Sequence, residues 1–231
     1  MFKSLLVVLT CLFAAVPVAI GQGRPEVFVG YSNLQSEGLP ERNDPNWPFN
    51  TGFFQDRSTQ HGVNVSVSGY GLGGFRGAGL GVTGDVSWAR QGTSSQLTAG
   101  DSSRHTDTYY FMGGPTLKFN RSGPSKLEPY MRVMAGAAHT RFRADTSTPV
   151  SGGTVTNAFT VGSTDFAASA GGGLDVRVGE SIKVRAVQVD WAPVFLRDRT
   201  VNVLGGTGVL APTTLDGQRQ DNWRFSFGVV F

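Results

Sequence analysis

The residues that could support hydrolytic chemistry are three histidines and one serine-containing tetrapeptide. The histidines are His61, His105 and His139, and residues 100–103 read GDSS. A serine nucleophile needs a histidine base and an acid close to it, and no histidine follows His139. We therefore interpret Ser102 as part of a polar loop and expect no catalytic residue. A hydrolase that uses one of the three histidines with a serine and an acid stays open as an alternative.

Two glycine-rich segments, residues 69–74 and 79–84, match the pattern G-x-G-x-x-G. A dinucleotide site of this kind needs a helix directly after the glycines, so that the pyrophosphate meets the helix N-terminus. Here strand-like segments or a tight turn follow. We attribute these glycines to turns and to limited space between strands. Because the three histidines also share no local spacing, the sequence predicts neither a cofactor nor a metal site.

Charged residues recur at alternate positions of strand-like segments, which places them on one face of each segment. Unpaired charges in a narrow interior would be destabilising, so we expect them to form a satisfied network of ion pairs. The alternative is a narrow polar conduit. The predicted network consists of Asp85, Glu128, Arg132, Asp175, Arg177, Lys183, Arg185, Asp190 and Arg224.

The first 21 residues have the layout of a removable secretory signal: Lys3, an uncharged apolar run over residues 5–20, and expected cleavage at residues 19–21. A membrane anchor or a buried helix is the alternative. Cys11, the single cysteine, would leave with this segment. The net charge is +3, and positive and negative residues are interspersed along the chain. Nothing therefore indicates nucleic acid as a partner. Residues 22–231 are predicted to form one domain.

Eight segments of this domain alternate apolar and polar residues with period two, which predicts strands. An even number suits an up-and-down barrel. In the seventh segment the apolar face changes phase near Ala186, which predicts a β-bulge there. The segments cover residues 25–34, 61–70, 79–89, 107–119, 127–137, 165–178, 181–196 and 223–231.

Short and long connections between these segments alternate strictly. Short turns are predicted at residues 72–74, 120–125 and 178–181, and long loops at residues 35–60, 90–104, 144–163 and 197–221. Outer-membrane barrels show this alternation, with short periplasmic turns and long extracellular loops. The sequence therefore predicts an all-β fold, an eight-stranded antiparallel up-and-down transmembrane β-barrel.

Aromatic residues fall near the predicted strand ends, where they would form girdles at the two lipid interfaces. The four that define the prediction are Trp88, Tyr109 and Trp191 at the outer interface and Phe119 at the inner one.

The last segment, WRFSFGVVF, places five apolar residues on one face and ends in phenylalanine. These are Trp223, Phe225, Phe227, Val229 and Phe231. The segment resembles the C-terminal signature of bacterial outer-membrane proteins, through which the barrel assembly machinery takes up its clients. Residues 22–231 as a whole resemble the eight-stranded outer-membrane β-barrel superfamily of OmpA-type transmembrane barrels, in architecture and terminal strand rather than in a catalytic motif.

This resemblance implies an integral protein of the bacterial outer membrane with a structural or surface-interaction role, presenting four long extracellular loops. Its expected partners are outer-membrane lipids and the barrel assembly machinery, with no nucleic acid and no enzymatic activity. Three alternatives stay open: a narrow channel or carrier for small solutes, a lipid-modifying enzyme at the barrel rim, and a soluble lipocalin-like barrel.

Overall fold

The computed structural model describes residues 25–37, 57–75, 77–97, 100–121, 125–150, 153–204, 210–215, 217 and 219–231. The predicted signal segment, residues 1–21, lies outside this range. Within the described residues, no helix is long and apolar enough to cross a membrane.

The described chain consists of strands joined by turns and bends. In order these are β1 (Glu26–Glu37), β2 (Arg57–Phe75), β3 (Ala78–Leu97), β4 (Gly100–Lys118), β5 (Leu127–Val150), β6 (Gly153–Arg177), β7 (Lys183–Trp191), β8 (Val194–Phe195), β9 (Arg199–Leu204), β10 (Leu210–Leu215), β11 (Arg219–Gln220) and β12 (Trp223–Val230).

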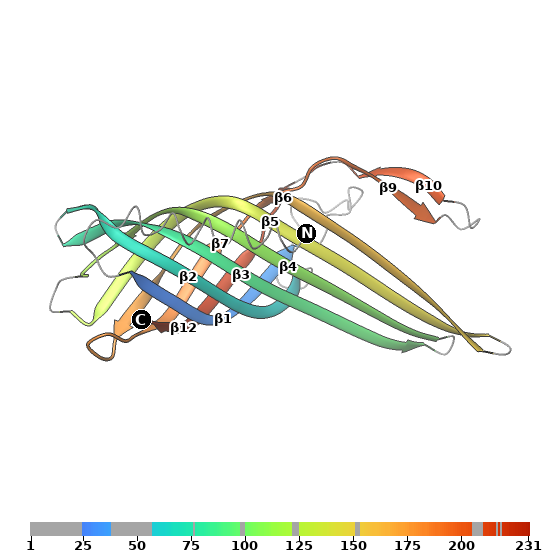
Figure 1. Cartoon of the computed structure of the whole chain (residues 1–231), viewed down its shortest axis with the longest axis horizontal. Helices are drawn as coiled ribbons and strands as arrows, with labels where there is room; N and C mark the ends of the chain where they lie inside the picture. Colours follow the sequence, from blue (N-terminus) through green and yellow to red (C-terminus); the bar gives the residue numbers. More distant parts are fainter. Residues whose placement is uncertain are drawn as a thin grey trace.

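The sheet closes on itself. β1 to β7 pair antiparallel in chain order, and β12 pairs with β7 on one side and β1 on the other. Backbone bonds between Phe231 and Val27 continue this last pairing to the final residue, with N···O distances of 2.9 and 3.1 Å. The C-terminus therefore lies at the barrel end opposite the long hairpins (Figure 1). These pairings confirm the predicted eight-stranded antiparallel barrel.

The predicted β-bulge in β7 is confirmed. Leu174 of β6 pairs with Val187, and the next residue, Asp175, pairs with Arg185, so that Ala186 has no partner on β6. The register between β7 and β12 shifts at the same level, between Ser226 and Gly228. The bulge accommodates the extra residue, so that the strand keeps its apolar side outward on both sides of Ala186.

The polarity of the barrel is that of a transmembrane barrel, with charged residues inside and apolar residues outside. Asp85, Asp175 and Asp190 are fully buried in the interior. On the outer face, Val133 is 61% exposed and Phe227 57% exposed. Successive residues of each strand point to opposite faces, so the outer face stays apolar along the strands that carry these charges.

Two of the four predicted long loops are wrong. The predicted loop over residues 90–104 is a continuation of the β3–β4 ladder, which pairs as far as Leu97 and Gly100. The predicted loop over residues 144–163 continues the β5–β6 ladder to Val150 and Gly153. These ladders carry β3, β4, β5 and β6 well beyond the rest of the barrel (Figure 1). Hairpin hydrogen bonds sustain the β3–β4 extension although its sequence is polar at almost every position, so the period-two signal is lost there.

The remaining connections differ in smaller ways from the prediction. The fourth predicted loop contains the β9–β10 hairpin, and most of the first lies outside the described residues. β2 continues to Phe75, past the turn predicted at residues 72–74, and Gly77, just before β3 begins, takes a φ of 84°. That backbone conformation favours glycine. β8 is separated from β7 at Pro193, which has no N–H to donate to a ladder.

Candidate functional site: the charged interior and the outer rim

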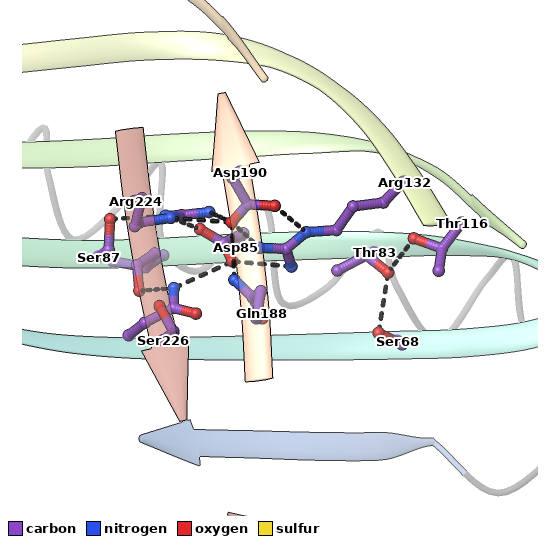
Figure 2. Close-up of polar contacts among 12 residues, drawn as sticks. Ser68, Thr83, Asp85, Ser87, Thr116, Arg132, Gln188, Asp190, Arg224 and Ser226 are labelled. Atoms are coloured by element: carbon purple, nitrogen blue, oxygen red, sulfur yellow. Dashed lines mark hydrogen bonds and ion pairs between the residues drawn. The ribbon is translucent and has the colours of Figure 1, made fainter. Parts of the chain in front are cut away.

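Four charged residues and one glutamine form a central cluster in the barrel: Asp85 of β3, Arg132 of β5, Gln188 and Asp190 of β7, and Arg224 of β12 (Figure 2). Arg224 donates from Nη1 to Asp85 Oδ1 at 2.7 Å and from Nη2 to Asp190 Oδ2 at 2.9 Å. Arg132 reaches the same two carboxylates, with Nη2 2.7 Å from Asp190 Oδ2 and Nη1 3.2 Å from Asp85 Oδ2. Two arginines thus balance two aspartates.

Neutral side chains complete the surroundings of the central cluster. Ser87 Oγ accepts from Arg224 Nη1 at 2.8 Å, and Asn64 Nδ2 donates to Asp85 Oδ2 at 3.0 Å. Beside it, the hydroxyls of Ser68, Thr83 and Thr116 form a chain across β2, β3 and β4, with spacings of 2.8 and 2.6 Å (Figure 2). The bonds from Ser87 and Asn64 offset part of the desolvation penalty that the buried charges carry.

A second set, the mouth cluster, lies at the end of the barrel that carries the short turns. Lys118 Nζ lies 2.6 Å from Glu26 Oε2 and 2.8 Å from Asp175 Oδ2. Lys183 Nζ lies 2.6 Å from both Glu26 Oε1 and Glu128 Oε2. The full cluster consists of Glu26, Lys118, Glu128, Asp175, Arg177, Lys183 and Arg185.

Gln188 connects the two clusters. Its Oε1 accepts from Arg185 Nη1 and from the Tyr130 hydroxyl, both at 2.8 Å, and its Nε2 donates to Asp190 Oδ2 at 2.7 Å. The Arg185 guanidinium is held between two aromatic rings, 4.2 Å from the Phe28 centroid and 4.4 Å from the Tyr130 centroid. Cation–π contacts of this kind suit an arginine that has left water.

An apolar layer covers the central cluster on the side away from the mouth. Its large members include Leu34, Tyr110, Met112 and Met134, all buried. The Tyr110 hydroxyl accepts from Asn222 Nδ2 at 2.8 Å. The layer also contains Ala89, Ala138, Ala167, Ala192 and Val194. Along the barrel axis, side chains therefore fill the interior as mouth cluster, central cluster and apolar layer, as expected for a barrel of eight strands.

The nine predicted network residues lie in these two clusters. Asp85, Arg132, Asp190 and Arg224 belong to the central cluster, and Glu128, Asp175, Arg177, Lys183 and Arg185 to the mouth cluster. The predicted network did not include Glu26, Lys118 and Gln188. Their alternation in the sequence already placed them on the polar faces of their segments, but their partners depend on how the barrel closes.

The four predicted girdle residues lie on the outer surface and are partly exposed. Trp88 is paired across strands with Tyr109, and Trp191 with Trp223. Phe119 follows the end of β4. Trp88 and Tyr109 do not lie at strand ends, because β3 and β4 continue past them. A location of these aromatic residues at a lipid interface stays a prediction.

Two of the three histidines, His61 and His139, contact neutral side chains in the described part of the molecule. His61 Nδ1 lies in hydrogen-bond contact with the Tyr31 hydroxyl, and His139 Nδ1 lies 2.8 Å from Thr164 Oγ1. The side chain of Ser102 lies outside the described part of the molecule. In the part of the chain that the structure covers, no group of three or more His, Cys, Asp or Glu residues could hold a metal ion.

Comparison with known proteins finds similarity in structure but not in sequence. No family model matches the chain, and no curated protein matches it. Among solved structures, Ail, the attachment invasion locus protein of Yersinia pestis, is 14% identical, with 91% of this chain and 100% of that chain covered and a TM-score of 0.47. A major outer membrane protein from Thermus thermophilus is 11% identical, with 89% of this chain and 98% of that chain covered and a TM-score of 0.48. The outer membrane protease OmpT from Escherichia coli is 10% identical, with 90% of this chain and 96% of that chain covered and a TM-score of 0.47.

Proposed function

We propose that this chain is an integral β-barrel protein of the bacterial outer membrane with a structural or surface-interaction role. The observation that carries the proposal is the inverted polarity of the barrel. Large apolar side chains such as Val133 and Phe227 face outward, while four ionised side chains of the central cluster are buried inside. A soluble lipocalin-like barrel would carry the opposite arrangement, with apolar residues lining the inside. Lipid around the barrel accounts for both faces.

The extended part of β3 to β6 supports an orientation in which these strands project outside the cell. Beyond Trp88 and Tyr109, β3 and β4 carry polar residues on both faces, such as Arg90 and Gln91 on β3. A ladder that is polar on both sides is suited to water rather than to lipid. We propose that this projecting sheet and the adjacent β9–β10 hairpin present the surface that contacts partners.

We further propose that the barrel does not conduct solutes and is not an enzyme. The packed interior supports the first statement, because the side chains of the apolar layer and of the central cluster are buried and contact one another. The hydrogen-bond partners of two histidines support the second statement. His61 and His139 make hydrogen bonds with Tyr31, Asn33 and Thr164 rather than with an acid and a serine nucleophile.

The C-terminal strand supports the proposed uptake by the barrel assembly machinery. Its face formed by Trp223, Phe225, Phe227, Val229 and Phe231 points outward, and Phe231 is 58% exposed. An exposed terminal ring contributes little to internal packing, so it is available for recognition before the barrel closes.

The test is heat-modifiability on a gel after outer-membrane fractionation, for the wild type and for a chain that lacks Phe231. We expect the wild type in the outer-membrane fraction, with a different mobility before and after boiling, and a several-fold lower folded yield in cells without Phe231. The control is refolding of both purified chains in detergent, which should give equal folded fractions. A soluble periplasmic protein with no shift on boiling would contradict the proposal.

A further inference from the structure

Basic side chains gather on one part of the outer surface, directly beyond the Trp88–Tyr109 pair. His61, Arg90, Asp107 and Arg141 are successive cross-strand partners on β2, β3, β4 and β5. One outward row further along, His105 of β4 pairs with Arg143 of β5. We name the basic members the basic arc: His61, Arg90, His105, Arg141 and Arg143.

The basic arc is exposed and lies on the same face as the apolar surface of the barrel. His61, Arg90, Arg141 and Arg143 are exposed, whereas Gln60 and Ala89, their neighbours in sequence on β2 and β3, are buried inward. Along β3 the outward residues run Val86, Trp88, Arg90. Since a strand rises about 3.4 Å per residue, Arg90 lies about 7 Å along the strand beyond Trp88.

One carboxylate sets the position of Arg90. Asp107 Oδ1 accepts from Trp88 Nε1 at 3.3 Å and lies 3.6 Å from Arg90 Nε. The contact of Arg90 with this carboxylate is through Nε, and the Arg90 side chain is 50% exposed. Asp107 is the one carboxylate among the described side chains of these rows.

Among the described side chains, the row of His61, Arg90, Asp107 and Arg141 carries more positive than negative charge. Two arginines against one aspartate give this row a net charge of +1 (2 − 1), before any histidine is protonated. On the strands that flank the arc, the partners in the same rows are uncharged: Asn33 and Gln35 on β1, and Thr160 and Gly162 on β6. At the β7 and β11 side, Arg219 is matched by Asp221 at 2.8 Å.

We propose that the basic arc binds the phosphate groups of an anionic lipid in the leaflet nearest the projecting hairpins. This inference rests on the proposed function, because it requires the Trp88–Tyr109 pair to lie at the lipid interface. An interfacial aromatic pair places the next outward row at the level of lipid head groups. Guanidinium groups recognise phosphate through charge-assisted, bidentate hydrogen bonds. Arg90 and Arg141, on strands separated by β4, are about 10 Å apart and can share one phosphorylated head group.

The test measures which lipid stays bound to the purified full chain. The protein is refolded in detergent, mixed with equal amounts of phosphatidylglycerol and phosphatidylcholine, and analysed by native mass spectrometry. The variant Arg90→Gln/Arg141→Gln removes two charges of the arc. The matched control Arg219→Gln removes an exposed rim arginine that also lies near a tryptophan, with its guanidinium 5.9 Å from the Trp191 ring.

We expect the wild type to retain phosphatidylglycerol over phosphatidylcholine, and the double variant to lose that preference by about tenfold, which corresponds to about 1.4 kcal/mol. Arg219→Gln should keep it. An unchanged preference in the double variant, or an equal loss in the control, would overturn the inference. Displacement of the lipid by inorganic phosphate would also overturn it, because the ligand would then be free phosphate.

Failure of the inference can be separated from failure of the proposed function. Insertion of the wild type into vesicles of phosphatidylcholine alone tests the barrel as a membrane protein without any anionic lipid. If the wild type inserts there but shows no preference for phosphatidylglycerol, only the proposed lipid binding by the basic arc is refuted. If the wild type does not insert, the proposed membrane protein is refuted, and the lipid binding by the arc is refuted with it.

Discussion

The central cluster and the mouth cluster use the same chemistry at different distances from water. In the central cluster, all four charged side chains are at most 1% exposed, and each arginine contacts both aspartates. In the mouth cluster, Arg177 and Lys183 are 32% and 16% exposed, and several cations share each carboxylate. Water reaches Arg177 and Lys183 at the mouth but no charged side chain at the centre, although Glu128 and Asp175 of the mouth cluster are themselves buried. The same substitution should therefore have different consequences in the two places.

The bulge at Ala186 is what allows one strand to serve both clusters. Arg185 on one side of it belongs to the mouth cluster, and Gln188 and Asp190 on the other side face the central cluster. Without the bulge, strict alternation through Ala186 would place the two sets on opposite faces. The difference between the clusters thus depends on one position of β7.

Insertion of one alanine between Val189 and Asp190 should have the largest effect. The chain would then have to expose either Asp190 or Lys183 and Arg185 to the lipid side, and a lipid-facing Arg or Lys is destabilising by about 2–4 kcal/mol at the membrane midplane. We expect almost no folded protein by gel mobility before boiling. Ala186→Ser, which keeps the residue count, is the control and should fold. A folded yield near that of the wild type would mean that β7 accommodates the added residue in a second bulge and that its phase does not couple the clusters.

Arg224→Met should be the most destabilising point substitution in the central cluster. It leaves Asp85 and Asp190 to share the charge of Arg132 alone, and removing one partner of a buried pair is destabilising by about 3–5 kcal/mol. The measurement is the free energy of unfolding in detergent, followed by tryptophan fluorescence. Adding Asp85→Asn should recover part of the loss, because the remaining charges are balanced again. No recovery would indicate that packing, rather than charge, dominates.

Met134→Ala should weaken the apolar layer above the central cluster. Truncation of a buried methionine is destabilising by about 2 kcal/mol at the low end of its range, and the cavity opens a route toward Arg132 from the outer side. We expect small conductance events in planar bilayers for this variant and none for the wild type. The exposed Met131→Ala on the outer face is the control. Conductance of the wild type itself would favour the narrow channel over the proposed closed barrel.

The fold was predictable from the sequence wherever a strand has one lipid-facing side. Alternation at Val63, Val65 and Val67, or the phase change at Ala186, records the two environments directly. It fails beyond Trp88, where β3 and β4 are polar at successive positions, and the extended parts of β3 to β6 were predicted as loops. It also missed the hairpin of β9 and β10.

The division of the interior was less predictable than its composition. Alternation places Asp85, Lys118 and Arg224 on inner faces, but which of them meet depends on strand tilt and closure, which no local pattern encodes. The apolar layer was missed for a related reason. Tyr110 and Met112 alternate with Tyr109 and Phe111, so both faces of this stretch are apolar and the inner one carries no polar signal.

Arg177→Met should have the smallest effect and completes the comparison with Arg224→Met. Arg177 contacts Glu128 and donates to the Arg121 carbonyl at 3.1 Å. After its removal, Glu128 still has Lys183 at 2.6 Å and Lys118 at 3.2 Å. Because the side chain is also one-third exposed, we expect a loss of about 1 kcal/mol or less in the free energy of unfolding, smaller again at high salt.

The salt dependence makes this last prediction a test of the whole contrast. Water and ions that reach the mouth should screen Arg177, so the difference between Arg177→Met and the wild type should shrink as salt rises. The difference for Arg224→Met should stay constant, because ions do not reach the central cluster. A loss of about 3 kcal/mol or more for Arg177→Met that is independent of salt would place both clusters in one buried environment. The mouth cluster would then be a second sealed layer, and exposure would not be what separates the two regions.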